Sequence, residues 1–249
     1  RGAPHSPPLG KSSRGRVARM PADLKPKPRR FYTPIEVSVH ASPEDCWVSF
    51  LGHVYDLTPL VKENEGPLVQ PLLKAAGSDI SHWFNEESGD VRTHMDPITN
   101  LERPYCPMGR FLHVAPQEPV GDWDTDFTTP WWKDAQYKMG KLAAHTRVVR
   151  IKNVLTGQED TMEVPSEEMI LEIRERYLEF NWHAASYSWK VLLKDPETEE
   201  HVFTPLDMEL TLEENNVPDD AEEFDELGID DTYYIPVIHL YYNDDLTVA

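Results

Sequence analysis

The sequence predicts an α+β protein with two folded units joined by a segment rich in proline and tryptophan. Short strand-like and helix-like runs alternate over residues 31–100, and the periodicity fades after residue 100. From residue 146 a regular order of two strands, a helix, a strand and a final strand returns. We therefore expect four segments: a disordered basic arm (1–30), a first domain (31–100), an extended strap (101–145) and a second domain (146–249).

Charge is divided unevenly along the chain. The 249 residues carry a net charge of −20, yet residues 1–30 contain nine Lys or Arg and a single acid, Asp23. After Lys194 there are 18 acidic residues and no basic one. An acidic body repels nucleic-acid phosphates and anionic lipid, so we expect no nucleic-acid partner. No apolar run approaches the roughly 18 residues that span a bilayer, so we expect no membrane insertion either.

Two helices are predicted from their start signals. Thr33 is a natural N-cap before Pro34, and Glu36 can complete a capping box. Thr58 is expected to cap a second helix that has Pro59 at its first position. Both helices belong to the first unit.

Further strands and helices follow from apolar periodicity. Strands are predicted at residues 46–51, 54–57, 148–154, 159–164, 187–193 and 233–242. Helices are predicted at residues 67–76 and 79–87 and after Ser166, which we expect to act as an N-cap. One face of that last helix carries Met169, Ile170, Ile173 and Tyr177.

Residues 101–145 have an unusual composition for a compact domain. Prolines recur at positions 104, 107, 116, 119 and 130, with Trp123, Trp131 and Trp132 between them. Disordered segments are poor in aromatic residues, so this stretch is not interpreted as a free linker. We expect a strap that packs its tryptophans onto a folded neighbour.

The first unit contains a series of motifs with specific spacing. They are Phe31-Tyr32-Thr33, His40, Cys46-Trp47-Val48, Val54-Tyr55-Asp56-Leu57-Thr58, and Ala76-Gly77-Ser78-Asp79 before Phe84. With these motifs, residues 31–100 resemble the cytochrome b5 family. The resemblance implies a cytochrome b5-like domain, with haem bound between helices through two histidines.

The ligand positions of that family are altered here. Asn64 and Gly89 stand where the two histidines are expected, and asparagine and glycine do not ligate haem iron. A branch of the same superfamily uses a tyrosine after Glu-Gly-Pro, but here that position holds Leu68. The neighbouring His94 and His82 remain as candidate haem contacts and iron ligands, and for each the other interpretation is an ordinary surface or core histidine.

The second unit shows a different resemblance. Its carrying segments are Leu155-Thr156-Gly157, Glu163-Val164-Pro165 and Leu206-Asp207-Met208-Glu209-Leu210-Thr211-Leu212. With them, residues 146–243 resemble ubiquitin, which implies a β-grasp domain interrupted by an acidic insertion at 213–231. The last residues given contain no Gly-Gly pair for conjugation, so we expect an interaction module.

Catalytic motifs are absent from the sequence. There is no Gly-x-Ser-x-Gly, no glycine-rich phosphate loop and no His-Glu-x-x-His. The acidic run at 219–226 lacks the spacing of a calcium loop and is interpreted as solvated. Cys46 and Cys106 are interpreted as reduced thiols, because two cysteines indicate neither a disulfide framework nor a zinc site. We expect no enzyme.

A b5-like unit and a ubiquitin-like unit in one chain resemble the cytochrome b5 domain-containing protein 1 family. This resemblance implies a non-catalytic structural or interaction component of the motile-cilium axoneme, with radial-spoke proteins as partners. The expected location is the cilium axoneme, within the cytoplasm and cytoskeleton. The alternative is a haem-binding redox sensor in the cilium that uses an atypical b5 pocket. A third interpretation is an electron donor to a desaturase or reductase.

Overall fold

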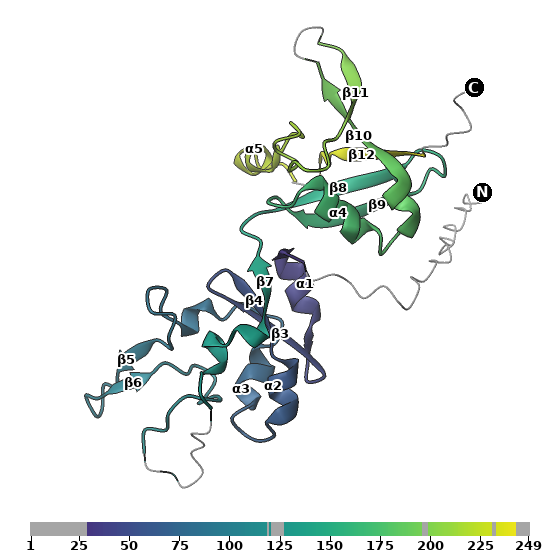
Figure 1. Ribbon diagram of the computed structural model, residues 1–249. Coiled ribbons are helices and arrows are strands. Elements are labelled where there is room, and N and C mark those ends of the chain that lie inside the picture. The colour runs from purple at the N-terminus through teal and green to yellow at the C-terminus, as the bar shows by residue number, and fades with distance from the viewer. Residues whose placement is uncertain (1–28, 119, 121–126, 196–198, 231–232, 243–249) are drawn as a thin grey trace, which may run out of the picture.

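The structure is a computed structural model that describes residues 29–118, 120, 127–195, 199–230 and 233–242. Most of the predicted basic arm, and Trp123 of the predicted strap, lie outside these residues. Two sheets follow one another along the chain, each with its own buried core (Figure 1). We call them the first unit (described residues up to 143) and the second unit (from 144). None of the helices in the described ranges is long and apolar enough to cross a membrane.

The first sheet has five strands in the order β1-β7-β4-β3-β2. Their bounds are β1 Phe31–Tyr32, β2 Ala41–Ser42, β3 Asp45–Phe50, β4 His53–Asp56 and β7 Lys138–Leu142. β1 pairs in parallel with β7, and the other neighbours are antiparallel. The strands predicted at residues 46–51 and 54–57 are confirmed as β3 and β4, which form a hairpin. Its turn places Leu51 and Gly52 at positive φ, as a two-residue hairpin loop requires.

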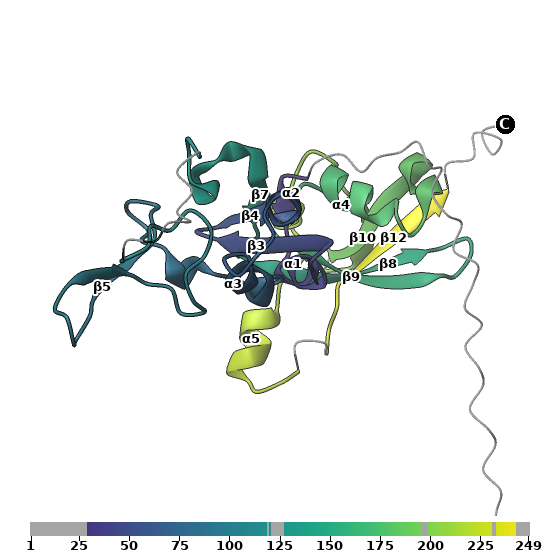
Figure 2. The same ribbon diagram turned by 90° about the horizontal axis from the view of Figure 1, so that it is seen from below.

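Short helices and one separate hairpin complete the first unit. The helices are α1 Pro34–Val39, α2 Thr58–Glu63, α3 Gln70–Ala75, and the single-turn 3₁₀ helices η1 Ser81–Trp83, η2 Trp131–Lys133 and η3 Ala135–Tyr137. The hairpin consists of β5 Thr93–Met95 and β6 Glu102–Pro104 and lies at the end of the molecule far from the second unit (Figures 1 and 2).

One predicted N-cap is confirmed and the other is wrong. Thr33 caps α1, and Glu36 accepts from the Thr33 backbone N–H at 2.9 Å. Thr58 does not cap α2, because its hydroxyl oxygen instead accepts from the backbone N–H of Cys46 at 2.9 Å. A bond from helix start to strand is a tertiary contact, which local sequence spacing does not reveal.

The predicted helix at 79–87 is largely wrong, since only η1 forms there. The start of this segment bonds to β3, since Ile80 N–H donates to Ser49 O at 2.8 Å. The Asp79 carboxylate accepts from the Ser49 hydroxyl at 2.8 Å and from Ser81 N–H at 3.0 Å. These bonds hold Trp83 and Phe84 against the sheet, where both are fully buried.

The predicted strap is folded into the first unit. β7 lies inside the first sheet between β1 and β4, and Trp131 and Trp132 are buried in the same core as α2 and α3. Gly140 allows this pairing, because a Cβ there would lie 2.9 Å from the carbonyl oxygens of Arg29 and Arg30. A boundary at residue 100 therefore divides segments that the structure packs together.

The second sheet also has five strands, in the order β11-β10-β12-β8-β9. Their bounds are β8 Thr146–Asn153, β9 Glu159–Pro165, β10 Tyr187–Lys194, β11 His201–Pro205 and β12 Val237–Tyr242. The first and last of them, β8 and β12, are parallel and adjacent, and all other pairs are antiparallel. The sequence predicted each of these strands except β11.

One face of this sheet is covered by α4 Ile170–Tyr177, as Figure 2 shows. Its predicted buried face is confirmed, since Ile170, Ile173 and Tyr177 are fully buried. The expected cap at Ser166 is wrong: the helix starts after Met169, whose N–H donates to the Glu172 carboxylate at 3.0 Å. η4 Trp182–Ser186 and α5 Ala221–Glu226 are the remaining helical segments of the described chain.

Candidate functional site

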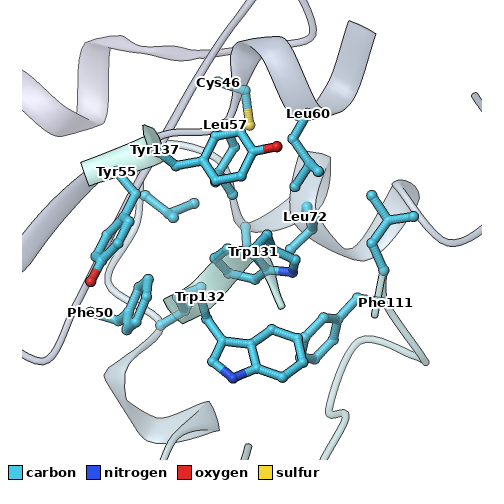
Figure 3. Close-up of a cluster of buried hydrophobic side chains, with 14 of the residues drawn as sticks. Cys46, Phe50, Tyr55, Leu57, Leu60, Leu72, Phe111, Trp131, Trp132 and Tyr137 are labelled. Carbon is cyan, nitrogen blue, oxygen red and sulfur yellow. The ribbon is translucent and has the colours of Figure 1, made fainter. Parts of the chain in front are cut away.

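The interior of the first unit is the natural place to look for a cofactor, and it is filled with aromatic rings. Trp131 lies at its centre, fully buried (Figure 3). Its ring centroid is 5.8 Å from that of Phe50, 6.0 Å from Phe84, 6.1 Å from Phe111 and 5.7 Å from Trp132. Separations of this size are those of packed edge-to-face aromatic pairs. The rings therefore form a closed core.

Polar contacts fix the two tryptophans in this core. The backbone N–H of Trp131 donates to Nδ1 of His113 at 2.9 Å. The indole N–H of Trp132 donates to the Asp90 carboxylate at 3.3 Å, and Lys133 pairs with the same carboxylate at 2.7 Å. The hydrogen bond from Lys133 lowers the pKa of Asp90, with a smaller effect from Trp132. The segment after Pro130 is thus held both by the burial of its two rings and by hydrogen bonds and an ion pair at its surface.

The positions that the b5 resemblance assigns to iron ligands carry other functions. Asn64 ends α2, and its side-chain amide donates to Leu60 O at 3.0 Å. Gly89 has a φ of +65° in a loop and donates to Asn85 O at 2.8 Å. Leu68 packs against the core as a half-buried apolar side chain. Asparagine here is a helix-terminating residue and glycine a turn residue, and neither provides a ligand.

His82 and His94 both lie on the outside of this core. His82 is in η1 and His94 in β5, and both side chains are exposed. The structure nevertheless brings them to one feature, the ring of Tyr105, whose centroid is 6.4 Å from His82 and 6.1 Å from His94. Tyr105 was not singled out by sequence reasoning, because its only signal is a lone aromatic between two prolines.

The two cysteines are not poised for chemistry. Both are free thiols, and Cys46 is fully buried. Burial, followed by the charges of Asp56 and Asp45, raises the pKa of the Cys46 thiol to about 11. Burial also raises the pKa of Cys106. A raised pKa leaves little thiolate at neutral pH, and the thiolate is the reactive form.

Metal-ligating side chains do not gather elsewhere in the described ranges. Within them, no three His, Cys, Asp or Glu side chains converge on a point that could hold a metal ion. This holds for the described part of the acidic insertion, which was interpreted as solvated.

One buried ion cluster lies where the two units meet. Arg176 of α4 donates twice to Glu168, at 2.6 and 2.7 Å, and both side chains are almost completely buried. The same guanidinium donates to the carbonyl oxygen of Phe31 at 2.7 Å and pairs with Glu36 of the first unit. Burial alone would lower the pKa of Arg176, but Glu168 and Glu36 outweigh it and raise that pKa. The cation is fully compensated by partners from both units.

Additional charged pairs surround this cluster. Arg29 binds both Glu36 of the first unit and Glu179 of the second. Arg30 lies 3.5 Å from Glu172. Glu36 thus serves α1 through its capping box and the junction through Arg176 and Arg29. α1 lies at this junction in both views of the molecule (Figures 1 and 2).

Known proteins with similar sequences cover most of the chain. Residues 33–143 match a family model described as "Cytochrome b5-like Heme/Steroid binding domain". A Xenopus laevis protein named "Cytochrome b5 domain-containing protein 1" is 52% identical over 225 residues, which cover 90% of this chain and 99% of that protein. The Homo sapiens protein of the same name is 50% identical over 226 residues, covering 90% and 95%. "Cytochrome b5 isoform E" of Arabidopsis thaliana is 34% identical over 93 residues, covering 36% and 68%.

The matched family is described as haem- or steroid-binding, and haem makes definite demands on the residues around it. A two-ligand haem needs strong axial ligands inside the domain. Asn64, Leu68 and Gly89 supply none, the two candidate histidines are exposed, and Trp131 fills the interior. These residues do not fit a six-coordinate haem held as the resemblance implies.

Proposed function

The chain belongs to the cytochrome b5 domain-containing protein 1 family, and from this premise we propose that it is a non-catalytic interaction component of the motile-cilium axoneme, associated with radial spokes. Its partners would be radial-spoke proteins. The ciliary location rests on what membership of this family implies. The non-catalytic role rests on the chemistry of the first unit.

A single observation carries the non-catalytic role: Trp131 occupies the centre of the b5-like core. With this ring fully buried among Phe50, Phe84 and Phe111, the fold is complete without a cofactor. Asn64 and Gly89 in the ligand positions agree with the same interpretation. Such a domain offers its surface to partners.

We further propose that the second unit is a ubiquitin-like β-grasp domain. Its strand order supports this, because the first and last strands, β8 and β12, are parallel neighbours at the centre of a mixed sheet. One helix, α4, crosses a single face of that sheet. The ion cluster around Arg176 would hold this module in a fixed orientation to the first unit, as a rigid scaffold requires.

The proposal is tested by locating the full chain in multiciliated cells. A fluorescently tagged protein should remain along axonemes after detergent extraction, and its signal should fall in axonemes that lack radial spokes. Complete loss of the signal with detergent would contradict an axonemal role. Full retention on spoke-less axonemes would contradict the association with radial spokes.

The alternative, a haem-linked redox sensor, keeps two supports. The matched family is described as haem- or steroid-binding, and His82 and His94 flank the same ring of Tyr105 on the surface. Haem contacts there would lie outside the core. Replacing each histidine by alanine during a haemin titration separates this alternative from the scaffold, because only a haem bound at that surface would lose affinity in a variant.

A further inference from the structure

The second sheet has one open face. Alternate residues of its strands point to opposite sides, and one set, including Ile151 and Leu240, is buried beneath α4. The other set is half-buried or exposed. It includes the six residues that we call the cationic face: Arg150, Lys152, Lys190, Phe203, His239 and Tyr241.

Strand register places basic side chains side by side on this face. Lys152 of β8 lies opposite His239 of β12, and His239 lies opposite Lys190 of β10. Arg150 is two residues along β8 from Lys152 and therefore on the same face. One carboxylate, Glu159 at the β9 end of the row, pairs with Lys152 at 2.6 Å. Lys190 and Arg150 make no ion pair with any described residue.

Aromatic rings lie among these cations. The ring of Phe203, which is 41% exposed, is 4.9 Å from His239 and 5.9 Å from Tyr241. The ammonium of Lys190 is 5.0 Å from the ring of Tyr241. Aromatic rings and weakly paired cations together form a surface that gains contacts when a partner removes water from it.

The charge of this face opposes that of the chain. The protein carries a net charge of −20, yet this row contains three Lys or Arg residues and a histidine. Neighbouring like charges across strands destabilise a sheet. Burial and the charge of Lys152 lower the pKa of His239, although the Val237 backbone and Glu159 act in the opposite direction. Glu159 compensates Lys152 at one end of the row, whereas Arg150 and Lys190 have no ion-pair partner among the described residues. An anionic partner would supply the charge that these two side chains lack.

We propose that the cationic face binds a short acidic segment of a partner protein, one that also carries apolar or aromatic side chains. The open face exposes the ring of Phe203, which an apolar side chain of a peptide segment can cover better than a phosphate backbone can. A long polyanion or an anionic bilayer would also meet the acidic remainder of the chain, whereas a short segment need touch only this face. This inference rests on the proposed function only in taking the second unit as an interaction module.

The test is a binding titration with the full chain and a fluorescently labelled peptide of alternating Glu and Phe, with a Lys/Phe peptide as the matched probe. We expect the Glu/Phe peptide alone to bind, with an affinity that falls as ionic strength rises to about 0.3 M. The double variant Arg150→Glu/Lys190→Glu should bind about tenfold more weakly. Lys190→Arg should bind normally, as should Lys74→Glu, an exposed charge reversal on α3.

Equal binding of the two peptides, or unchanged affinity in the double variant, would overturn the proposal. Thermal unfolding of each variant checks its fold. Should the double variant not fold, Phe203→Ser removes one exposed ring without altering charge, and its affinity for the Glu/Phe peptide should also fall. Because this titration does not involve cilia, its outcome is separate from that of the localisation experiment.

Discussion

The guanidinium of Arg176, in the second unit, donates to the carbonyl oxygen of Phe31, in the first, across 2.7 Å. The same group binds Glu168, which is 1% exposed, and Glu36. The start of the first sheet is thereby tied to α4, and three groups, two from the first unit and one from the second, share one buried cation. This side chain therefore links the two units directly.

Replacing Arg176 by alanine should lower the free energy of unfolding by about 3–5 kcal/mol, because it leaves the Glu168 carboxylate buried without its cation. Chemical denaturation monitored by circular dichroism measures the change. Arg174→Ala is the matched control on the same helix, since Arg174 makes no ion pair within the described residues, and it should cost little. Equal effects of the two substitutions would show that the ion cluster does not stabilise the junction.

Trp131→Ala should also be severe, with a loss of about 3–5 kcal/mol, because a fully buried ring leaves a large cavity. Urea unfolding and the near-ultraviolet dichroism of the aromatic core report the effect. Trp182→Ala is the control, since that ring is 47% exposed. A folded, equally stable Trp131→Ala protein would support a detachable strap and contradict the shared core.

His53 and His239 should both titrate below the ordinary histidine value of 6.5. For His53 the causes are burial, followed by the positive charges of Lys138 and Lys141, opposed by a backbone contact from Gly140. A lowered folded pKa means that the unfolded chain takes up protons first. The stabilising contribution is therefore present above pH 6.5 and is lost as the pH falls through the folded pKa.

Nuclear magnetic resonance of the histidine ring protons measures these pKa values directly. Lys138→Gln removes one of the positive charges near His53 and should move its pKa upward, toward 6.5, while His239 stays unchanged. A His53 pKa at or above 6.5 in the unmodified protein would contradict the assigned causes.

Cys106 should react with iodoacetamide before Cys46 does in the folded protein. Cys46 is fully buried and its pKa is raised to about 11, whereas Cys106 is partly accessible. Mass spectrometry of the alkylated peptides gives the order, and unfolding in urea should make the two rates similar. Faster labelling of Cys46 would mean that the core around it opens readily.

Local features of the fold could be predicted from the sequence. The Thr33 and Glu36 capping box depends on neighbouring residues, and it formed as expected. The buried face of α4 followed from its spacing. Features that depend on distant partners could not be predicted in this way: Arg176 meets Glu36 across 140 positions, and no spacing rule joins them.

In the candidate site, too, local features could be predicted from the sequence and features that depend on distant residues could not. Asn64 and Gly89 were identified from motif spacing, and the structure gives each a local backbone function. Trp131 was expected to pack onto a folded neighbour, but which neighbour depends on the core that it completes. Whether a tryptophan packs on its own domain or on a partner depends on which surface has a shape complementary to the ring. The residue type alone does not specify that surface.

The most direct test of this account is a haemin titration of the purified full chain, followed by absorption spectroscopy under oxidising and reducing conditions. A closed core around Trp131 and the missing axial ligands predict no stoichiometric uptake with the sharp Soret band of a six-coordinate haem, either in the unmodified protein or in the His82→Ala and His94→Ala variants. Stoichiometric uptake with that band, abolished in one of the two variants, would contradict the scaffold and establish the histidine as an iron ligand.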